Sequence, residues 1–184
     1  MGIIGITALN AKSYVATIIQ YTSLVSGAVG TGVGILMGRY AGKNEFDKMK
    51  KLSRTALLFA VGANVLFSLS VYFLRIPLIS AFTENTEIYR MITPIFLLDV
   101  LVEFGRAVNH VLERSLIATK DILTTFTASL ASCWIGSVLL SFVFGVLLGY
   151  GLVGCWIAFA LDEFIKAFIY AVRWKNGKWK KHMF

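Results

Sequence analysis

Long apolar runs separated by short polar connections make up most of this chain. Five of them, at roughly residues 14–38, 54–76, 91–112, 123–148 and 152–173, are long enough to span a membrane, since a spanning helix needs about 20 mainly apolar residues. Backbone groups cannot stay unpaired in lipid, and the alternation of a membrane barrel is absent, so these runs predict helices. The pattern therefore predicts an all-α integral membrane protein, a bundle of about five transmembrane helices that form a single domain over residues 1–184.

Basic residues are unevenly distributed among the connections between these runs. The first connection has six of them: Arg39, Lys43, Lys48, Lys50, Lys51 and Arg54. Glu84 and Glu87 lie in the second connection, the third contains Arg114 and Lys120, the fourth has no charge, and residues 174–184 form a basic tail. Because Lys and Arg concentrate on the cytoplasmic side of membrane proteins, the first and third connections and the tail are predicted to be cytoplasmic. The N-terminus is then external, and we expect that a preceding segment is missing.

The composition agrees with a membrane protein, since 57% of the residues are hydrophobic, 15% are charged and the mean hydropathy is +0.73. The net charge of +8 would fit nucleic-acid binding, but the basic residues lie beside the apolar runs, so no nucleic-acid partner is expected. Two cysteines and two histidines form no metal or disulfide pattern. A Ser/His pair, paired catalytic aspartates and an HExxH motif are absent from the sequence, so we expect neither an enzyme nor a cofactor.

A glycine-rich stretch, SGAVGTGVGILMGRYAG, ends the first run. It does not fit a phosphate-binding loop, because no Lys-Ser or Lys-Thr follows the glycines and no strand-to-helix switch surrounds them. Gly30, Gly34 and Gly38 are spaced by four, which is typical of close helix packing in membranes. We therefore predict a packing face there, although small residues can also leave room for a central cavity or permit bending.

The third run has polar residues along one helix face, namely Asp99, Glu103, Arg106, His110 and Glu113, with Asn109 beside them. An ionised side chain near the middle of a span costs at least about 2.5–3.5 kcal/mol. This face therefore cannot point to lipid and must meet water, partner charges or both. We expect its acidic residues to border a hydrated cavity that exchanges cations.

These residues have both structural and functional interpretations. Glu103 and Arg106 are three apart and can form an ion pair that only joins helices. Asp99 is harder to explain in this way, because Arg106 cannot readily satisfy two carboxylates. A carboxylate at this depth can exchange a proton near neutral pH or hold a sodium ion with nearby oxygens. Asp99 is therefore the leading candidate for a coupling-ion site and Glu103 the second, with Arg106 and Asn109 as further candidates for a substrate cavity. Asn64 in the second run can line the same cavity or hydrogen-bond between helices.

The last run repeats this pattern with Asp162, Glu163 and Lys166. Asp162 and Lys166 are four apart, so we expect them to form an ion pair. We interpret the three residues as candidates for a structural ion-pair clamp in preference to a binding site. Trp174 and Trp179 follow this run and are expected to anchor it among the lipid headgroups.

Three stretches resemble one known family when they are taken in order: GRYAGKNEFDKMKK at 38–51, LVEFGRAVNHVLERSLIATKD at 101–121, and GLVGCWIAFALDEFIKAFIYAVRWKNGKWKK at 151–181. Their order and spacing resemble the C-terminal lobe of the multidrug and toxic compound extrusion (MATE) family, over nearly the whole chain. The apolar runs would then be spans eight to twelve of a twelve-span fold with two six-helix lobes. One departure is Lys120, at a position where the family usually has Gly.

The resemblance implies a function that the residues alone do not establish. Members of this family export drugs and other organic cations in exchange for sodium ions or protons. The chain would thus be part of an efflux antiporter in the cell membrane, and its partners would be lipid and small, mainly cationic organic substrates. Transport would also need the missing N-terminal lobe or a second subunit, because a lone lobe has no opposing wall. Two alternatives stay open: a lipid or polysaccharide flippase of the same superfamily, and a non-transporting truncated fragment.

Overall fold

The computed structural model describes residues 6–182, and nearly all of them are helical. In chain order the elements are α1 (Ile6–Gly42), α2 (Phe46–Phe73), α3 (Arg75–Ser80), α4 (Thr86–Ala118), α5 (Ile122–Ala131), the π-helical η2 (Ser132–Leu140) and η3 (Val143–Leu147), α6 (Gly151–Lys175) and the 3₁₀-helix η4 (Lys178–His182). No strand occurs within this described range. The predicted all-α membrane bundle is confirmed.

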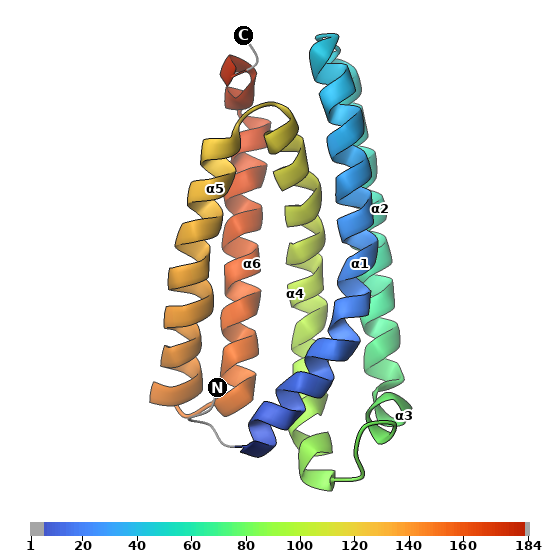
Figure 1. Cartoon of the computed structure of the whole chain (residues 1–184), viewed down its shortest axis with the longest axis vertical. Helices are drawn as coiled ribbons and strands as arrows, with labels where there is room; N and C mark the ends of the chain where they lie inside the picture. Colours follow the sequence, from blue (N-terminus) through green and yellow to red (C-terminus); the bar gives the residue numbers. More distant parts are fainter. Residues whose placement is uncertain (1–5, 183–184) are drawn as a thin grey trace.

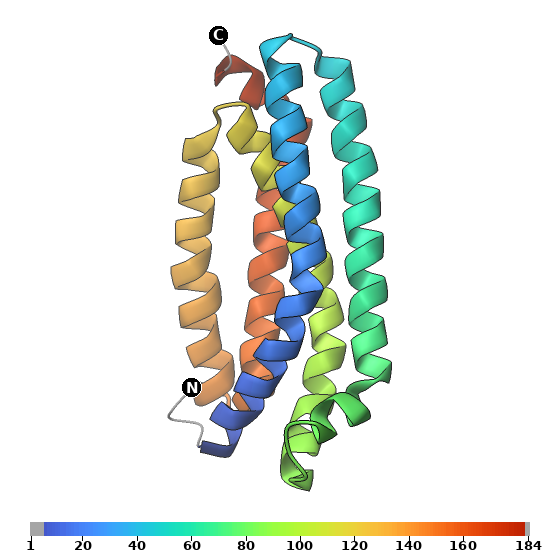
Figure 2. The ribbon, with the colours of Figure 1, turned by 45° about the vertical axis from the view of Figure 1, so that its right-hand side comes forward.

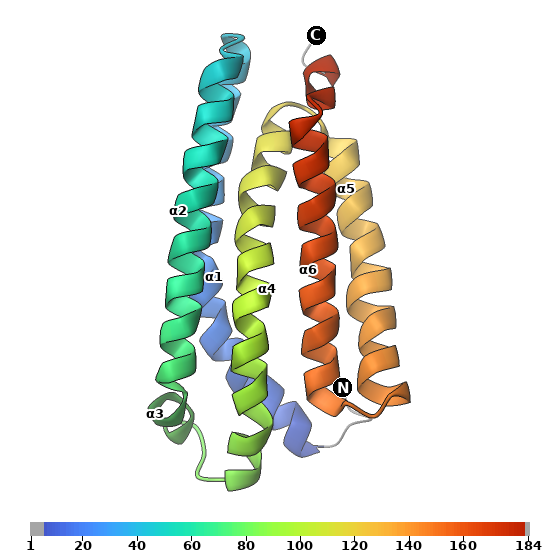
Figure 3. The ribbon, with the colours of Figure 1, turned by 180° about the vertical axis from the view of Figure 1, so that it is seen from behind.

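The long helices stand side by side as rods, with α4 packed against α1, α2 and α6 (Figure 1). α5, η2 and η3 continue one another as a single rod along α6, on the side away from α2 (Figure 3). The α1–α2 turn, the α4–α5 turn and η4 lie at one end of the bundle, whereas α3 lies at the opposite end (Figure 2). We call the first of these the basic end, because it carries residues 39–54, 114–120 and 174–182. The connections that were predicted to share one side of the membrane therefore share one end of the fold.

Each predicted span overlaps one of these rods. α1, α2 and the rod from Ile122 to Leu147 are long and apolar enough to cross a membrane. α4 and α6 contain 33 and 25 residues, so they are also long enough, but they carry the buried charges described below. The span predicted at 54–76 ends early, since α2 stops at Phe73. Pro77 has no N–H for the Phe73 carbonyl and its ring would clash with that carbonyl, so the chain turns and continues as α3.

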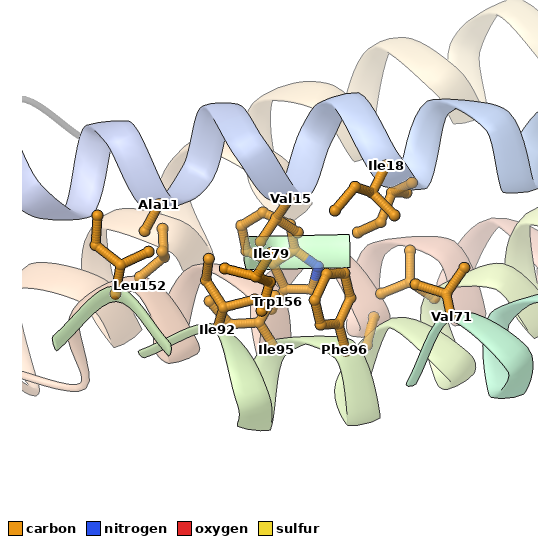
Figure 4. Packing of buried hydrophobic residues seen from close by; sticks show 14 residues of the cluster. Ala11, Val15, Ile18, Val71, Ile79, Ile92, Ile95, Phe96, Leu152 and Trp156 are labelled. Atoms are coloured by element: carbon orange, nitrogen blue, oxygen red, sulfur yellow. The ribbon is translucent and has the colours of Figure 1, made fainter. Parts of the chain in front are cut away.

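Apolar side chains form two separate cores along the rods. The core near α3 joins α1, α2, α3, α4 and α6, and Figure 4 shows Val15 of α1 facing Phe96 of α4 and Trp156 of α6. The second core lies nearer the basic end and includes Met37 and Leu112. The stretch of the bundle between the two cores contains the polar residues of the candidate site.

The three predicted packing glycines differ in their surroundings. A Cβ on Gly30 would lie 2.7 Å from the carbonyl oxygen of His110, and one on Gly34 would lie 3.5 Å from the Cβ of Arg114, so both glycines pack against α4. Gly38 is exposed and a Cβ there would meet nothing within 4 Å, so its predicted packing role is wrong. A spacing of four drifts by about 40° per step around a helix, and by the third glycine the face has turned away from α4.

The basic tail folds back onto the bundle at the basic end. Trp179 is 1% exposed, and its ring stacks on Trp174 with 4.6 Å between the ring centroids. Trp174 Nε1 in turn donates a hydrogen bond of 3.1 Å to Ser53 Oγ on α2. Trp179 is therefore packed inside the protein, and its predicted place among the headgroups is wrong. Residues 183 and 184 of the predicted tail lie outside the described residues.

Candidate functional site

Polar residues from three helices meet between the two apolar cores. Each helix contributes two of them, four residues apart and therefore one turn apart on the same face: Thr22 and Ser26 from α1, Asn64 and Ser68 from α2, Asp99 and Glu103 from α4. All six are buried, and the two carboxylates are 2% and 0% exposed. Because α1 and α4 run toward the basic end and α2 runs away from it (Figure 1), the six residues form two stacked layers.

The layer nearer the basic end is held together by Asn64. Its Nδ2 donates to Ser26 Oγ at 2.9 Å and to Glu103 Oε2 at 2.8 Å. Glu103 also forms an ion pair with Arg106, in the next turn of α4. The expected pair between these two residues is thereby confirmed, and Asn64 links it to two further helices.

The other layer contains buried oxygens that lack partners. Ser68 Oγ donates to Asp99 Oδ2 at 3.5 Å, and the indole of Trp156 also faces this carboxylate. Within residues 6–182, Asp99 Oδ1 and Thr22 Oγ1 have no hydrogen-bond partner, and neither has Asn64 Oδ1 in the layer nearer the basic end. Buried polar atoms are normally satisfied. One carboxylate and two neutral oxygens in this state indicate a place suited to a cation or a proton.

A second cluster joins α4 to α6. Arg106 Nε lies 3.8 Å from Glu163 Oε1, and Lys166 Nζ lies 3.2 Å from both Glu163 Oε1 and Asp162 Oδ2. Asn109 Nδ2 donates to Glu163 Oε2 at 2.6 Å and to the Glu163 carbonyl at 2.9 Å. The predicted ion pair between Asp162 and Lys166 is confirmed, and Glu163 is the residue that Arg106, Asn109 and Lys166 share.

A polar cavity of about 320 Å³ opens beside this second cluster, among α1, α4, α5 and α6. Its lining includes Arg106, Asn109, His110, Glu163, Lys166 and Tyr170. Asn109 is 5% exposed, and its Oδ1 has no partner among the described residues. With carboxylates and cations on its wall, the cavity suits a charged organic molecule.

The expectation that the two acidic residues of α4 border a hydrated cavity is wrong for this conformation. Asp99 and Glu103 are sealed between helices and do not line the polar cavity. Arg106 and Asn109, also selected from the sequence, do line it. The reason is the central position of α4, because the turns that carry the carboxylates meet α1 and α2, whereas the following turns meet α6.

Asp162 faces a different element from Glu163. Its carboxylate accepts hydrogen bonds from Ser132 Oγ and, at 3.2 Å, from Ser137 Oγ. These two serines are five apart and would point about 140° away from each other in an α-helix, but the i→i+5 winding of η2 brings them to one side. A Cβ on Gly136 would also collide with this carboxylate. The fourth predicted span is therefore helical as expected, with a wider winding where it meets Asp162.

Sequence reasoning did not single out Thr22, Ser26 or Ser68. A signal was present, since Thr22 and Ser26, like Asn64 and Ser68, repeat the spacing of four between Asp99 and Glu103. Small hydroxyl residues are frequent where membrane helices pack, so this spacing does not by itself indicate a site. Only the packing of three helices brings the pairs together.

The sequence matches the model of the MatE family over residues 1–147. This range covers most of the chain and includes all six residues of the two buried layers. The chain belongs to the MatE family. The resemblance carried by the three sequence stretches is thereby confirmed, and this MatE chain is a multi-pass membrane protein.

Three curated relatives of the MatE chain are much longer than it is. "Uncharacterized transporter YisQ" of Bacillus subtilis (strain 168) is 30% identical over 179 residues, which cover 97% of this chain and 39% of that protein. "Probable multidrug resistance protein NorM" of Pseudomonas putida is 24% identical over 168 residues, 88% of this chain and 36% of the relative. A protein of the same name from Mannheimia succiniciproducens is 24% identical over 164 residues, 87% and 34% of the two chains. The chain thus spans less than two fifths of these relatives, and no solved structure matches it significantly.

Proposed function

We propose that this chain is part of an efflux antiporter that exports small, mainly cationic organic molecules in exchange for sodium ions or protons. It would act in the cell membrane, with the basic end and the C-terminus in the cytoplasm. Asp99, assisted by Glu103, would carry the coupling cation, and the polar cavity beside Arg106 and Asn109 would hold substrate. Two relatives whose names describe multidrug resistance proteins support this assignment.

The observation that carries the proposal is the pair of layers between α1, α2 and α4. A carboxylate buried at this depth requires a positive partner or a proton. Arg106 forms its ion pair with Glu103, and the groups that hydrogen-bond to the Asp99 carboxylate among the described residues, Ser68 and Trp156, are neutral, so Arg106 acts on Asp99 only from a distance. A proton would satisfy one of the unpartnered oxygens, whereas a hard cation takes several oxygen ligands at once. Because three such oxygens are available, on α1, α2 and α4, we propose sodium first and a proton second as the coupling ion.

The charges of the cavity also bear on the substrate. A flippase for an anionic lipid headgroup needs cations that are free to bind it. Arg106 and Lys166 both lie within ion-pair distance of carboxylates, so they favour the export of organic cations over lipid transfer. The remainder of a longer protein, or a second subunit, would supply the opposing wall of the transport pathway.

The proposal is tested by measuring the thermal unfolding of the purified chain in lipid nanodiscs. Sodium chloride is compared with potassium chloride at equal ionic strength, and each series is repeated from pH 6 to pH 8. A ligand that binds only the folded state raises Tm, so sodium is expected to stabilise the unaltered chain and to leave Asp99→Asn unaffected. Asp47→Asn is the matched control, because Asp47 is exposed at the start of α2.

Different outcomes separate the two coupling ions. A pH effect that requires Asp99, without any sodium effect, would assign the proton in place of sodium. If Asp99→Asn responded to sodium and pH in the same way as the unaltered chain, Asp99 would not be the coupling site and the assignment would fall.

A further inference from the structure

The ion pairs at the centre of the bundle converge on a single guanidinium group. Arg106 is hydrogen-bonded through Nη1 to Glu103, which belongs to the buried layers, and its Nε lies 3.8 Å from Glu163 Oε1, which lines the polar cavity. Its side chain is 27% exposed and forms part of the cavity wall, whereas the side chain of Glu103 is fully buried. One residue therefore connects the proposed cation layers to the proposed substrate cavity.

The two carboxylates compete for this one positive charge. A hydrogen bond to an ionised partner is strong at normal length and weakens steeply beyond it, so at 3.8 Å Arg106 itself neutralises Glu163 less than it neutralises Glu103. Glu163 also faces Lys166 and Asn109, and the cavity around it includes His110 and Glu113. Both carboxylate partners of Lys166 are on its own helix. Of these groups, Arg106 is the one that touches both clusters.

We propose that Arg106 couples the two sites by changing its carboxylate partner. A cation that neutralises Glu103 from the layer side removes the attraction that holds the guanidinium there. Arg106 then moves toward Glu163, adds positive charge to the cavity and weakens the binding of an organic cation. Conversely, an organic cation on Glu163 drives Arg106 back to Glu103 and opposes the coupling cation. The two cations thus bind antagonistically, which is the relation that an exchange mechanism requires.

This inference rests on the proposed function and goes beyond it, because it assigns the link between two sites and not either site alone. Its sign follows from competition for Arg106, since a cation at Glu103 releases the guanidinium toward Glu163 and a cation at Glu163 returns it to Glu103. A rotation of the long Arg side chain within the cavity wall is enough to make the exchange, and no helix has to move.

The test measures the affinity of the purified chain in nanodiscs for tetraphenylphosphonium, a lipophilic organic cation, by equilibrium dialysis. Dissociation constants are compared in sodium chloride and in potassium chloride at equal ionic strength, and at pH 6 and pH 8. The unaltered chain is expected to bind tetraphenylphosphonium at least about fivefold more weakly when the coupling cation is present, which is the lower range of measured couplings between sites. In Arg106→Gln, binding is expected to persist and the sodium or pH effect to fall below about twofold.

Two further variants keep the result interpretable. Arg106→Gln leaves a buried carboxylate unpaired and can unfold the chain, so Arg106→Lys is measured as well, since it keeps the charge and loses the two-sided fork that reaches both carboxylates. In Arg106→Lys, too, the effect of sodium or pH on tetraphenylphosphonium affinity is expected to fall below about twofold. Lys166→Gln is the matched control, because this cavity cation does not bridge to α4 and its removal should preserve the coupling factor even if affinity changes.

The outcomes distinguish this inference from the proposed function. Antagonism that survives at full strength in folded Arg106→Lys, or in folded Arg106→Gln, would overturn the role of Arg106 and leave the antiporter proposal intact. Antagonism lost equally in Lys166→Gln would overturn it too, since any change of cavity charge would then be sufficient. If the unaltered chain showed no antagonism at all, both the coupling and the proposed exchange would be wrong.

Discussion

Lys120 and Asn44 are the two residues other than glycine with positive φ, at 64° and 58°, within the described part of the chain. Both lie in the turns at the basic end, and Lys120 follows the last turn of α4, where Lys120 N donates to the Ile117 carbonyl. Helices frequently end on a left-handed residue, usually Gly. The departure noted in the sequence, Lys where the resembling family has Gly, therefore falls on a residue whose backbone conformation favours Gly.

Replacing Lys120 with Gly is expected to stabilise the chain by about 0.5–1 kcal/mol. The left-handed conformation costs residues other than Gly roughly 1–2 kcal/mol, and Gly removes this cost. Part of the gain is offset because Gly increases the conformational entropy of the unfolded chain. The measurement is Tm by circular dichroism in detergent. Lys43→Gly is the control, since Lys43 lies in the other turn without a positive φ and should show no gain. A loss of stability in Lys120→Gly would contradict this interpretation.

The rod from Ile122 to Leu147 shows how two elements depend on each other. Its apolar sequence is sufficient to predict a helix, but the π-helical winding of η2 becomes understandable only beside α6, where Asp162 accepts from both Ser132 and Ser137. Lys166 completes this contact from the next turn of α6. The wider winding is therefore matched to a specific pairing between neighbouring helices.

Asp162→Ala is expected to loosen this rod, since Ser132 and Ser137 lose their acceptor and an unsatisfied buried group costs about 1–3 kcal/mol. The readout is the rate at which a maleimide alkylates Cys133, an exposed free cysteine within η2, together with Tm. Faster alkylation and a lower Tm are expected. Thr127→Ala serves as the control, because the Thr127 hydroxyl bonds only to carbonyls of its own helix. Unchanged alkylation in Asp162→Ala would show that the serine contacts do not hold the rod.

At the scale of the whole molecule, the basic end is organised by the returning tail. Trp179 packs on Trp174 of α6, which is bonded to Ser53 of α2, and Phe46 at the start of α2 has its ring centroid 6.0 Å from that of Trp179. The tail thereby connects the last helix to the second one. The basic segments at this end would repel one another without such apolar contacts, so the aromatic residues help to hold them together.

Trp179→Ala is expected to undock η4 and expose the lysines of the tail. A loss of only 1.4 kcal/mol of docking free energy raises the open population about tenfold, and removal of a buried Trp commonly costs more. Trypsin should therefore cleave within residues 178–181 at least about ten times faster, as measured by mass spectrometry of the intact chain. Trp134→Ala is the control, because Trp134 is 64% exposed on η2. Equal cleavage of the two variants would mean that the stack does not hold the tail.

Much of this fold could be predicted from the sequence because the deciding properties belong to single segments. Apolar length identifies the spans, the placement of Lys and Arg assigns the connections to one end, and Pro77 accounts for the end of α2 once its position is considered. Helical periodicity likewise placed Asp99, Glu103 and Arg106 on one face, and spacing alone predicted the pairs Glu103–Arg106 and Asp162–Lys166.

The partners of these faces depend on contacts between distant segments. Asn64 reaches both Ser26 and Glu103, Asn109 reaches Glu163, and Trp174 reaches Ser53, over separations from 38 to 121 residues. Helical periodicity shows which side chains share a face, but it contains no information on which helix that face will meet. For this reason the chain's own pattern identified the charged residues of α4, whereas their division between two buried polar layers and an open cavity wall arose only when α4 was packed between its neighbours.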